Sequence, residues 1–127
     1  MTQKEFEEGT YEGELDENSL RDGYGILNYN KTNDWKNGSI YKGNWKNNKK
    51  HGIGILYWSN SNIWYEGNWF EDEKHGEGCL YYSDGKVWYK GIYNMGTKDE
   101  KGVEYWPNGN IKYDGQFKNN KYHGEGT

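Results

Sequence analysis

The sequence predicts an all-β protein, built as an elongated single-layer antiparallel sheet of stacked β-hairpins. The chain of 127 residues has no alanine but 19 glycines, so strong helix formers are scarce. It contains 13 Tyr, 7 Trp and 3 Phe, and these rings must supply most of its core. It also repeats itself every 24 residues or so, and each copy alternates large and polar side chains. A helical protein is therefore excluded.

The repeat is marked by the motif Tyr-x-Gly, with a second large apolar side chain two residues after the glycine. The tyrosines of the five copies are Tyr11, Tyr41, Tyr65, Tyr89 and Tyr113. The second large side chains are Leu15, Trp45, Trp69, Tyr93 and Phe117. A His-Gly-x-Gly motif follows in three copies, beginning at His51, His75 and His123, and is degenerate in the other two. We therefore divide the chain into an acidic lead-in at 1–10 and an array at 11–127 with repeats 11–40, 41–64, 65–88, 89–112 and an incomplete 113–127.

Each repeat has the pattern of one hairpin. In repeat 65–88, two alternating segments are separated by a six-residue, mostly polar segment, which we expect to form the hairpin loop. Pairing Trp69 with Gly76 across this loop places Gly67 opposite Gly78. Five such hairpins predict about ten strands.

A tight turn over Ser83–Lys86 leads from one hairpin to the next and pairs Tyr82 with Val87. One face of the sheet then bears two rows of large side chains with a row of glycines between them. Because strands bend easily where they lack Cβ atoms, we expect the sheet to curl into an aromatic-lined groove. The opposite face is predicted to be mostly solvated and to bear Lys42, Ile55, Glu66, Cys79, Lys90, Val103 and Asp114.

The two rows of large side chains are the candidate partner-binding site. A single sheet has no second layer to cover them, and contiguous exposed apolar area marks binding surfaces. Tyr and Trp suit such a surface because they lose little rotamer freedom on binding. The predicted groove residues are Tyr41, Trp45, Leu56, Tyr65, Trp69, Leu80, Tyr89, Tyr93, Tyr113 and Phe117. The alternative is that these side chains pack on one another and serve only as the core.

These motifs resemble the MORN (membrane occupation and recognition nexus) repeat, which residues 41–58 and 65–82 fit at nearly every defining position. The resemblance implies an open, twisted array of antiparallel hairpins with an aromatic groove. Similar repeats occur in junctophilins, radial spoke head proteins and plant phosphatidylinositol phosphate kinases. In these proteins the repeats are targeting, dimerising or partner-binding modules, so the resemblance implies an interaction role without catalysis.

The residues themselves also give no support for an enzyme. Equivalent histidines of adjacent hairpins should lie about 9.6 Å apart, too far to share one metal ion, so we predict structural roles for them. The carboxylates of Glu71, Asp72 and Glu73 fall in a polar loop, where nothing apolar would raise their pKa values for acid catalysis. Cys79 has no predicted histidine neighbour to activate it. We expect no catalytic residue, metal or cofactor.

Charge and hydropathy exclude other classes. A net charge of −4 does not provide the basic surplus that nucleic-acid binding needs. The longest apolar run is Ile55–Trp58, far short of the roughly 20 residues that span a bilayer, and we expect a cytoplasmic protein. We do not expect strong recognition of anionic lipid, because the best basic cluster has only three members, Lys46, Lys49 and Lys50.

The leading functional hypothesis is a non-enzymatic scaffold that binds a peptide, an amphipathic helix or a second copy through the groove, in a cytoskeletal or ciliary assembly. Residue 127 falls within the second strand of the last hairpin, so a terminal edge strand is expected to be open to pairing, for example in a homodimer through the terminal repeat. One alternative is a phosphoinositide-binding membrane module. Another is the accessory repeat array of a larger enzyme.

Overall fold

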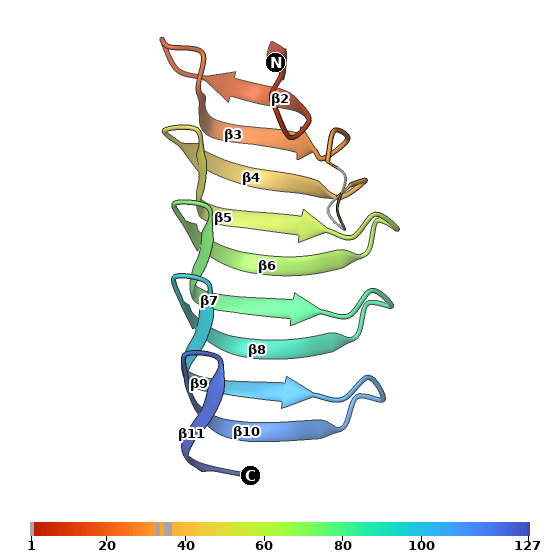
Figure 1. Cartoon of the computed structure of the whole chain (residues 1–127), viewed down its shortest axis with the longest axis vertical. Helices are drawn as coiled ribbons and strands as arrows, with labels where there is room; N and C mark the ends of the chain where they lie inside the picture. The colour runs from red at the N-terminus through yellow and green to blue at the C-terminus, as the bar shows by residue number, and fades with distance from the viewer. Residues whose placement is uncertain (1, 33, 35–36) are drawn as a thin grey trace.

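The protein is one open antiparallel sheet, which confirms the predicted fold class (Figure 1). The computed structural model describes residues 2–32, 34 and 37–127, and in that part of the chain it contains no helix, hence none that could span a membrane. The strands lie in sequence order: β1 (Thr2–Glu5), β2 (Thr10–Leu15), β3 (Arg21–Asn28), β4 (Ile40–Lys46), β5 (Lys49–Tyr57), β6 (Ile63–Phe70), β7 (Glu73–Tyr81), β8 (Val87–Asn94), β9 (Thr97–Tyr105), β10 (Ile111–Lys118) and β11 (Lys121–Gly126).

The sheet has eleven strands where the repeats predict about ten. The additional strand, β1, lies within the acidic lead-in and pairs with β2, so that Lys4 lies opposite Tyr11. Phe6 follows β1 and packs its ring edge-on against Tyr11, with 5.9 Å between the ring centroids. The sequence of β1 carries no large apolar side chain, and for this reason the alternation pattern does not reveal it.

The predicted register is correct in the middle of the strands. Gly67 lies opposite Gly78, and Tyr65 lies opposite Leu80. The next pairing, between β7 and β8, places Gly78 opposite Gly91. A continuous row of glycines therefore crosses the sheet, with large side chains on both sides of it.

Near the hairpin turns the predicted register is wrong. Trp69 pairs with Lys74 rather than with Gly76, because β7 contains a bulge between Lys74 and Gly78. Gly76 lies in this bulge with a φ of 85°, a left-handed conformation that favours glycine. The same two-residue shift occurs between the two strands of every hairpin from β2 to β11.

The bulge shortens the hairpin loops. The expected six-residue loop is a turn of two residues, Glu71 and Asp72, whose φ values of 47° and 70° are those of a type I′ turn. The backbone N–H of Asp72 donates a hydrogen bond of 3.0 Å to the carbonyl of Lys50 in the preceding repeat. Corresponding bonds tie the other turns of this edge to their preceding repeats, from Asn48, Gly96 and Asn120.

The turn expected at residues 83–86 is present, and Gly85 N–H donates to the carbonyl of Tyr82 at 2.9 Å. The predicted pair of Tyr82 and Val87 is wrong, since Val87 pairs with Tyr81. Tyr82 belongs to the turn, where its N–H donates to the Lys86 carbonyl and its ring stacks on Trp88.

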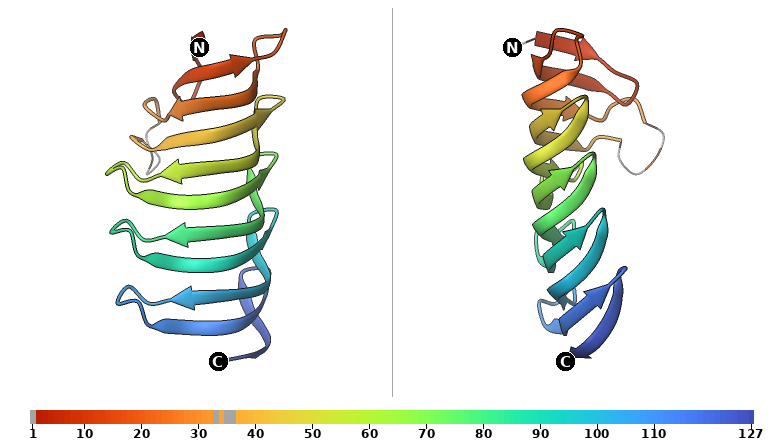
Figure 2. Two further views of the ribbon diagram at one scale, coloured as in Figure 1. Left: turned by 180° about the vertical axis from the view of Figure 1, so that it is seen from behind. Right: turned by 90° about the vertical axis from the view of Figure 1, so that its left-hand side faces the viewer.

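The sheet folds at the glycine row toward the face that bears Tyr65 and Trp69, which we call the ring face. These residues would be about 13 Å apart on a flat strand, yet their ring centroids are 5.1 Å apart. Figure 2 shows the hairpin ends turned out of the plane of the remaining strand segments. The face that bears Glu66 and Cys79 is consequently the outside of the bend, and we call it the outer face.

Candidate functional site

The ring face holds the core of the protein. All ten predicted groove residues are buried, with exposed fractions between 0% for Tyr41, Tyr65 and Tyr89 and 9% for Tyr113. The rings therefore fill the inside of the bend, and the groove that they line is occupied by their own side chains. This burial favours the alternative role, packing on one another. Contact of these ten side chains with a partner stays a prediction.

The rings pack edge to face in a continuous series along the array. Tyr65 contacts Trp69 of its own repeat at 5.1 Å and Tyr93 of the next repeat at 5.6 Å, both nearly perpendicular. Tyr41 contacts Trp69 in the same way, at 5.5 Å. Such pairs contribute roughly 0.5–1.5 kcal/mol each beyond the area they bury. The aromatic core thus joins each hairpin to its neighbours.

The tyrosine hydroxyls also fix the bend. The hydroxyl of Tyr65 donates a hydrogen bond of 3.0 Å to the backbone carbonyl of Asn68, three residues further along the same strand. The same bond recurs from Tyr11, Tyr41, Tyr89 and Tyr113. Burial raises the pKa of the Tyr89 hydroxyl to about 12, so the phenol keeps the proton that it donates.

A row of cations that the sequence did not predict lies among the rings. Because of the bulge, Lys50, Lys74 and Lys98 face the same side as the tryptophan row. The Lys50 ammonium group lies 5.1 Å from the centroid of the Trp69 ring, and that of Lys98 lies 5.1 Å from that of Tyr89. Arg21 holds the corresponding place in the first repeat, 4.4 Å from the Trp45 ring. The 24-residue spacing of the three lysines was the available signal.

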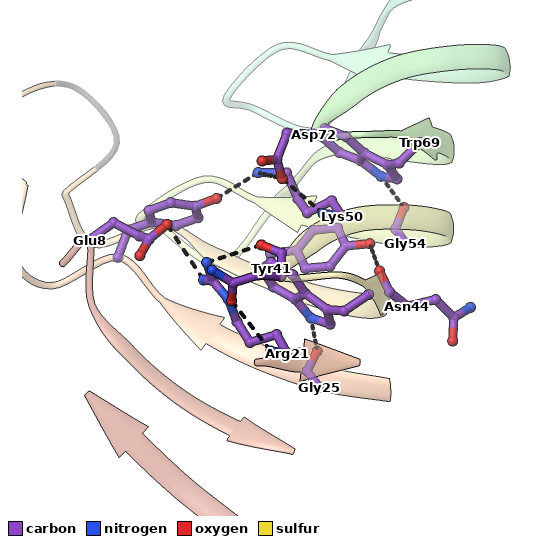
Figure 3. A network of polar contacts seen from close by, with 12 residues as sticks. Glu8, Arg21, Gly25, Tyr41, Asn44, Lys50, Gly54, Trp69 and Asp72 are labelled. Carbon is purple, nitrogen blue, oxygen red and sulfur yellow. Dashed lines mark hydrogen bonds and ion pairs between the residues drawn. The ribbon is translucent and has the colours of Figure 1, made fainter. Parts of the chain in front are cut away.

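Lys50 is held by polar groups from the preceding and the following repeat (Figure 3). Its ammonium group donates a hydrogen bond of 2.8 Å to the Tyr29 hydroxyl and lies 3.9 Å from the carboxylate of Asp72. Asp72 also accepts a hydrogen bond of 2.8 Å from the backbone N–H of Lys50. Of the predicted basic cluster, Lys50 thus has its polar partners within the protein, whereas Lys46 and Lys49 are exposed.

The next two cations differ in their partners. Lys98 forms an ion pair of 2.6 Å with Glu104, which is 8% exposed and occupies the place that Leu80 holds one repeat earlier. Lys74 forms no ion pair with any residue that the structure describes. Burial lowers the pKa of Lys74, and the charge of Lys50 lowers it further.

Two of the histidines considered as metal ligands, His51 and His75, contact other side chains and backbone of the sheet. The rings of His51 and His75 flank Phe70, at 5.3 and 5.7 Å. His75 also accepts a hydrogen bond of 3.1 Å from the backbone N–H of Met95. No cluster of three His, Cys, Asp or Glu side chains with metal-binding geometry occurs among the described residues.

The outer face is the open surface of the sheet. Across β4 to β10, one side chain per strand forms what we call the outer row: Lys42, Ile55, Glu66, Cys79, Lys90, Val103 and Asp114. All seven are partly or fully exposed. A shallow hollow of about 860 Å³ lies beside this row over the glycines of β6 to β10. This face carries the exposed charges and apolar groups that a partner could contact.

Cys79 lies in the middle of the outer row, next to Glu66 and Lys90 on the neighbouring strands. Burial raises the pKa of its thiol, and this disfavours the thiolate that a nucleophile requires. The hydroxyl of Tyr81, on the same face, donates a hydrogen bond of 2.5 Å to Glu66.

These features define a class of protein: an open β-hairpin repeat array with an aromatic core on one face and an uncovered surface on the other. The MORN repeat matches residues 41–63, 65–87, 89–111 and 113–127, and the chain belongs to the MORN repeat family. A comparison with curated proteins finds no match. Membership indicates a module for repeat-based interaction or membrane association, in a family that is generally not enzymatic.

Proposed function

We propose that this chain is a non-enzymatic scaffold that binds protein partners through its outer face. The observation that carries the proposal is the outer row, in which charged and apolar side chains alternate on a sheet surface with no second layer. The apolar members give a partner area to bury, and the charged members give orientation and selectivity.

The aromatic core supports this proposal indirectly. The buried rings of neighbouring hairpins pack on one another inside the bend. This packing holds the strands that present the outer row in a fixed arrangement. A rigid, pre-formed surface loses little entropy on binding. The cytoskeletal or ciliary setting remains part of the proposal on the resemblance to radial spoke head proteins, and pairing of β11 with a partner strand stays a prediction.

The structure favours a protein surface over an anionic lipid surface as the target. Lipid recognition wants four to eight clustered basic residues. Lys50 binds Asp72 and Tyr29 within the fold, which leaves Lys46 and Lys49 of the predicted cluster.

Partner capture with outer-face variants tests the proposal. A partner captured by the wild-type protein is first purified and then titrated against each variant. Ile55→Asp and Val103→Asp place new charges in the outer row, and each should abolish binding of this partner. Ile111→Asp is the matched control, because Ile111 is 56% exposed at the first position of β10, outside the outer row. Equal titration curves for wild type and both outer-row variants would contradict the proposal. So would saturable binding to vesicles containing phosphatidylinositol bisphosphate at physiological salt.

A further inference from the structure

We propose that a second copy of this chain binds the outer face, in a two-fold symmetric dimer whose two outer rows run antiparallel and cross at Cys79. The inference rests on the proposed function, for which it names the partner. It follows from the order of charges along the outer row.

The charged members of the outer row alternate in sign. Lys42 on β4, Glu66 on β6, Lys90 on β8 and Asp114 on β10 are each separated by one strand with an apolar residue. The strands that carry neighbouring charges are therefore about 9.6 Å apart. Among the described residues, none of these four side chains forms an ion pair. Glu66 accepts a hydrogen bond from Tyr81, and the Lys42 ammonium group lies 5.2 Å from the centroid of the Tyr57 ring, but no opposite charge among the described residues neutralises any of the four. Each can therefore pair with a charge on a partner.

A two-fold axis at Cys79 satisfies every one of these charges. In a symmetric interface, residues equally far from the axis on opposite sides face each other. Glu66 then faces Lys90 of the second copy, and Lys42 faces Asp114 of the second copy. Each contact occurs twice, so the dimer contains four acid and base pairs. An axis at Glu66 would instead bring Lys42 to Lys90, and like charges would meet.

The apolar residues agree with the same axis. Ile55 faces Val103 of the second copy, and the axis itself passes a small side chain, Cys79. An axis at Ile55 would also match acids with bases, but it would oppose two β-branched side chains. Cys79 is the smallest side chain of the outer row, so two copies can approach each other most closely there.

The bend limits the contact to one part of the sheet. Two sheets pack face to face about 10 Å apart. Because each sheet folds toward its ring face at the glycine row, the hairpin ends slope away from the second copy, and Glu77 there does not meet its own symmetry mate. The contact spans seven strands, about 34 Å, but is narrow, so we expect a weak and reversible dimer.

Charge exchange combined with cross-linking tests this dimer. Sedimentation velocity of the full chain, over concentrations reaching about 1 mM, should show a monomer–dimer equilibrium that weakens with salt. Glu66→Lys alone and Lys90→Glu alone should each abolish the dimer, and the double variant should restore it, because the reversed charges face each other again. A short bismaleimide should link two wild-type chains through Cys79, and Cys79→Ser should remove the linked product.

The outcomes separate this inference from the proposed function. A chain that stays monomeric throughout, or a double variant as monomeric as the singles, overturns the dimer. Restored dimerisation without a Cys79-linked product overturns the axis at Cys79. If the chain is monomeric yet loses a captured partner on Ile55→Asp, only the dimer fails. If capture does not depend on the outer row, the proposed function fails as well.

Discussion

The phenol ring of Tyr65 lies against the backbone of Gly78 on the neighbouring strand, in the space that a Cβ atom would need. The corresponding contacts join Tyr41 to Gly54 and Tyr89 to Gly102. The glycine row and the tyrosine row therefore depend on each other, because the backbone of a glycine on one strand leaves space for a tyrosine ring from the neighbouring strand.

We predict that Gly78→Ala destabilises the protein by about 3 kcal/mol, because the new methyl group must displace a ring that the core encloses. Urea unfolding measures the difference in free energy of unfolding. Gly85→Ala is the control: its Cβ would meet no atom within 4 Å, and its φ of 95° should cost only about 1 kcal/mol. Similar losses for the two variants would contradict the role assigned to Tyr65.

We predict that Tyr93→Trp stabilises the protein. The indole N–H groups of Trp45 and Trp69 donate hydrogen bonds to the carbonyls of Gly25 and Gly54, at 3.3 and 3.2 Å. Tyr93 occupies the equivalent place, but its buried hydroxyl has no hydrogen-bond partner among the described residues. A tryptophan there should bond the Gly78 carbonyl and add about 1 kcal/mol to the free energy of unfolding.

Thermal unfolding would show this gain as a rise in Tm of a few degrees, roughly 2–5 °C for a domain of this size. Tyr93→Phe separates the two contributions, since it removes the orphaned hydroxyl without enlarging the ring. It should be neutral or slightly stabilising, as Phe117 occupies the same place in the next repeat. A Tm below that of wild type for both variants would refute this explanation.

Equivalent lysines should respond differently to the same substitution. Lys98→Met leaves Glu104 without its closest cation and should cost about 2 kcal/mol. Lys74→Met removes a half-buried charge that has no carboxylate partner in the described chain, so its free energy of unfolding should stay within about 0.5 kcal/mol of wild type or exceed it. Equal losses from the two variants, measured by urea unfolding, would show that ion pairing does not distinguish the repeats.

The contribution of Glu104 should depend on pH. Burial acts to raise its pKa, but hydrogen bonds from Lys98 and Tyr122, with the charges of Lys98 and Lys112, outweigh burial and hold the pKa below 4.5. Because the folded-state pKa is the lower one, the stabilisation is present above pH 4.5 and is lost as the pH falls through that lowered value. The Tm difference between wild type and Glu104→Gln should therefore be largest at neutral pH and shrink under acid. A difference independent of pH would contradict this assignment.

The sequence predicts the strand order, the central register and the glycine row, because these follow from strict alternation around Tyr-x-Gly. It does not predict the bulge at Gly76, which shifts the pairing by two residues and turns Lys74 onto the ring face. The mostly polar composition of residues 70–75 is typical of a loop, but a type I′ turn needs only Glu71 and Asp72. The polar side chains of residues 73–75 therefore gave no indication that β7 begins at Glu73.

The outer face is a second candidate surface that the sequence could not indicate, for a related reason. Alternation assigns Tyr65 and Trp69 to one face correctly, but it cannot show that the sheet folds toward that face until the rings fill the bend. The residues of the outer row were assigned to their face correctly and were interpreted as a solvated back. What the sequence did not reveal was which face the bend would leave open.

Hydroxyl-radical footprinting of the native protein, read by mass spectrometry at individual tryptophans, shows whether the ring face is the core. Trp45 and Trp69, at 4% and 6% exposure, should be protected while Trp106, at 47%, should be oxidised quickly. Oxidation of Trp45 and Trp69 at the rate of Trp106 would mean that the rings line an open groove, and it would contradict the assignment of the ring face as the core.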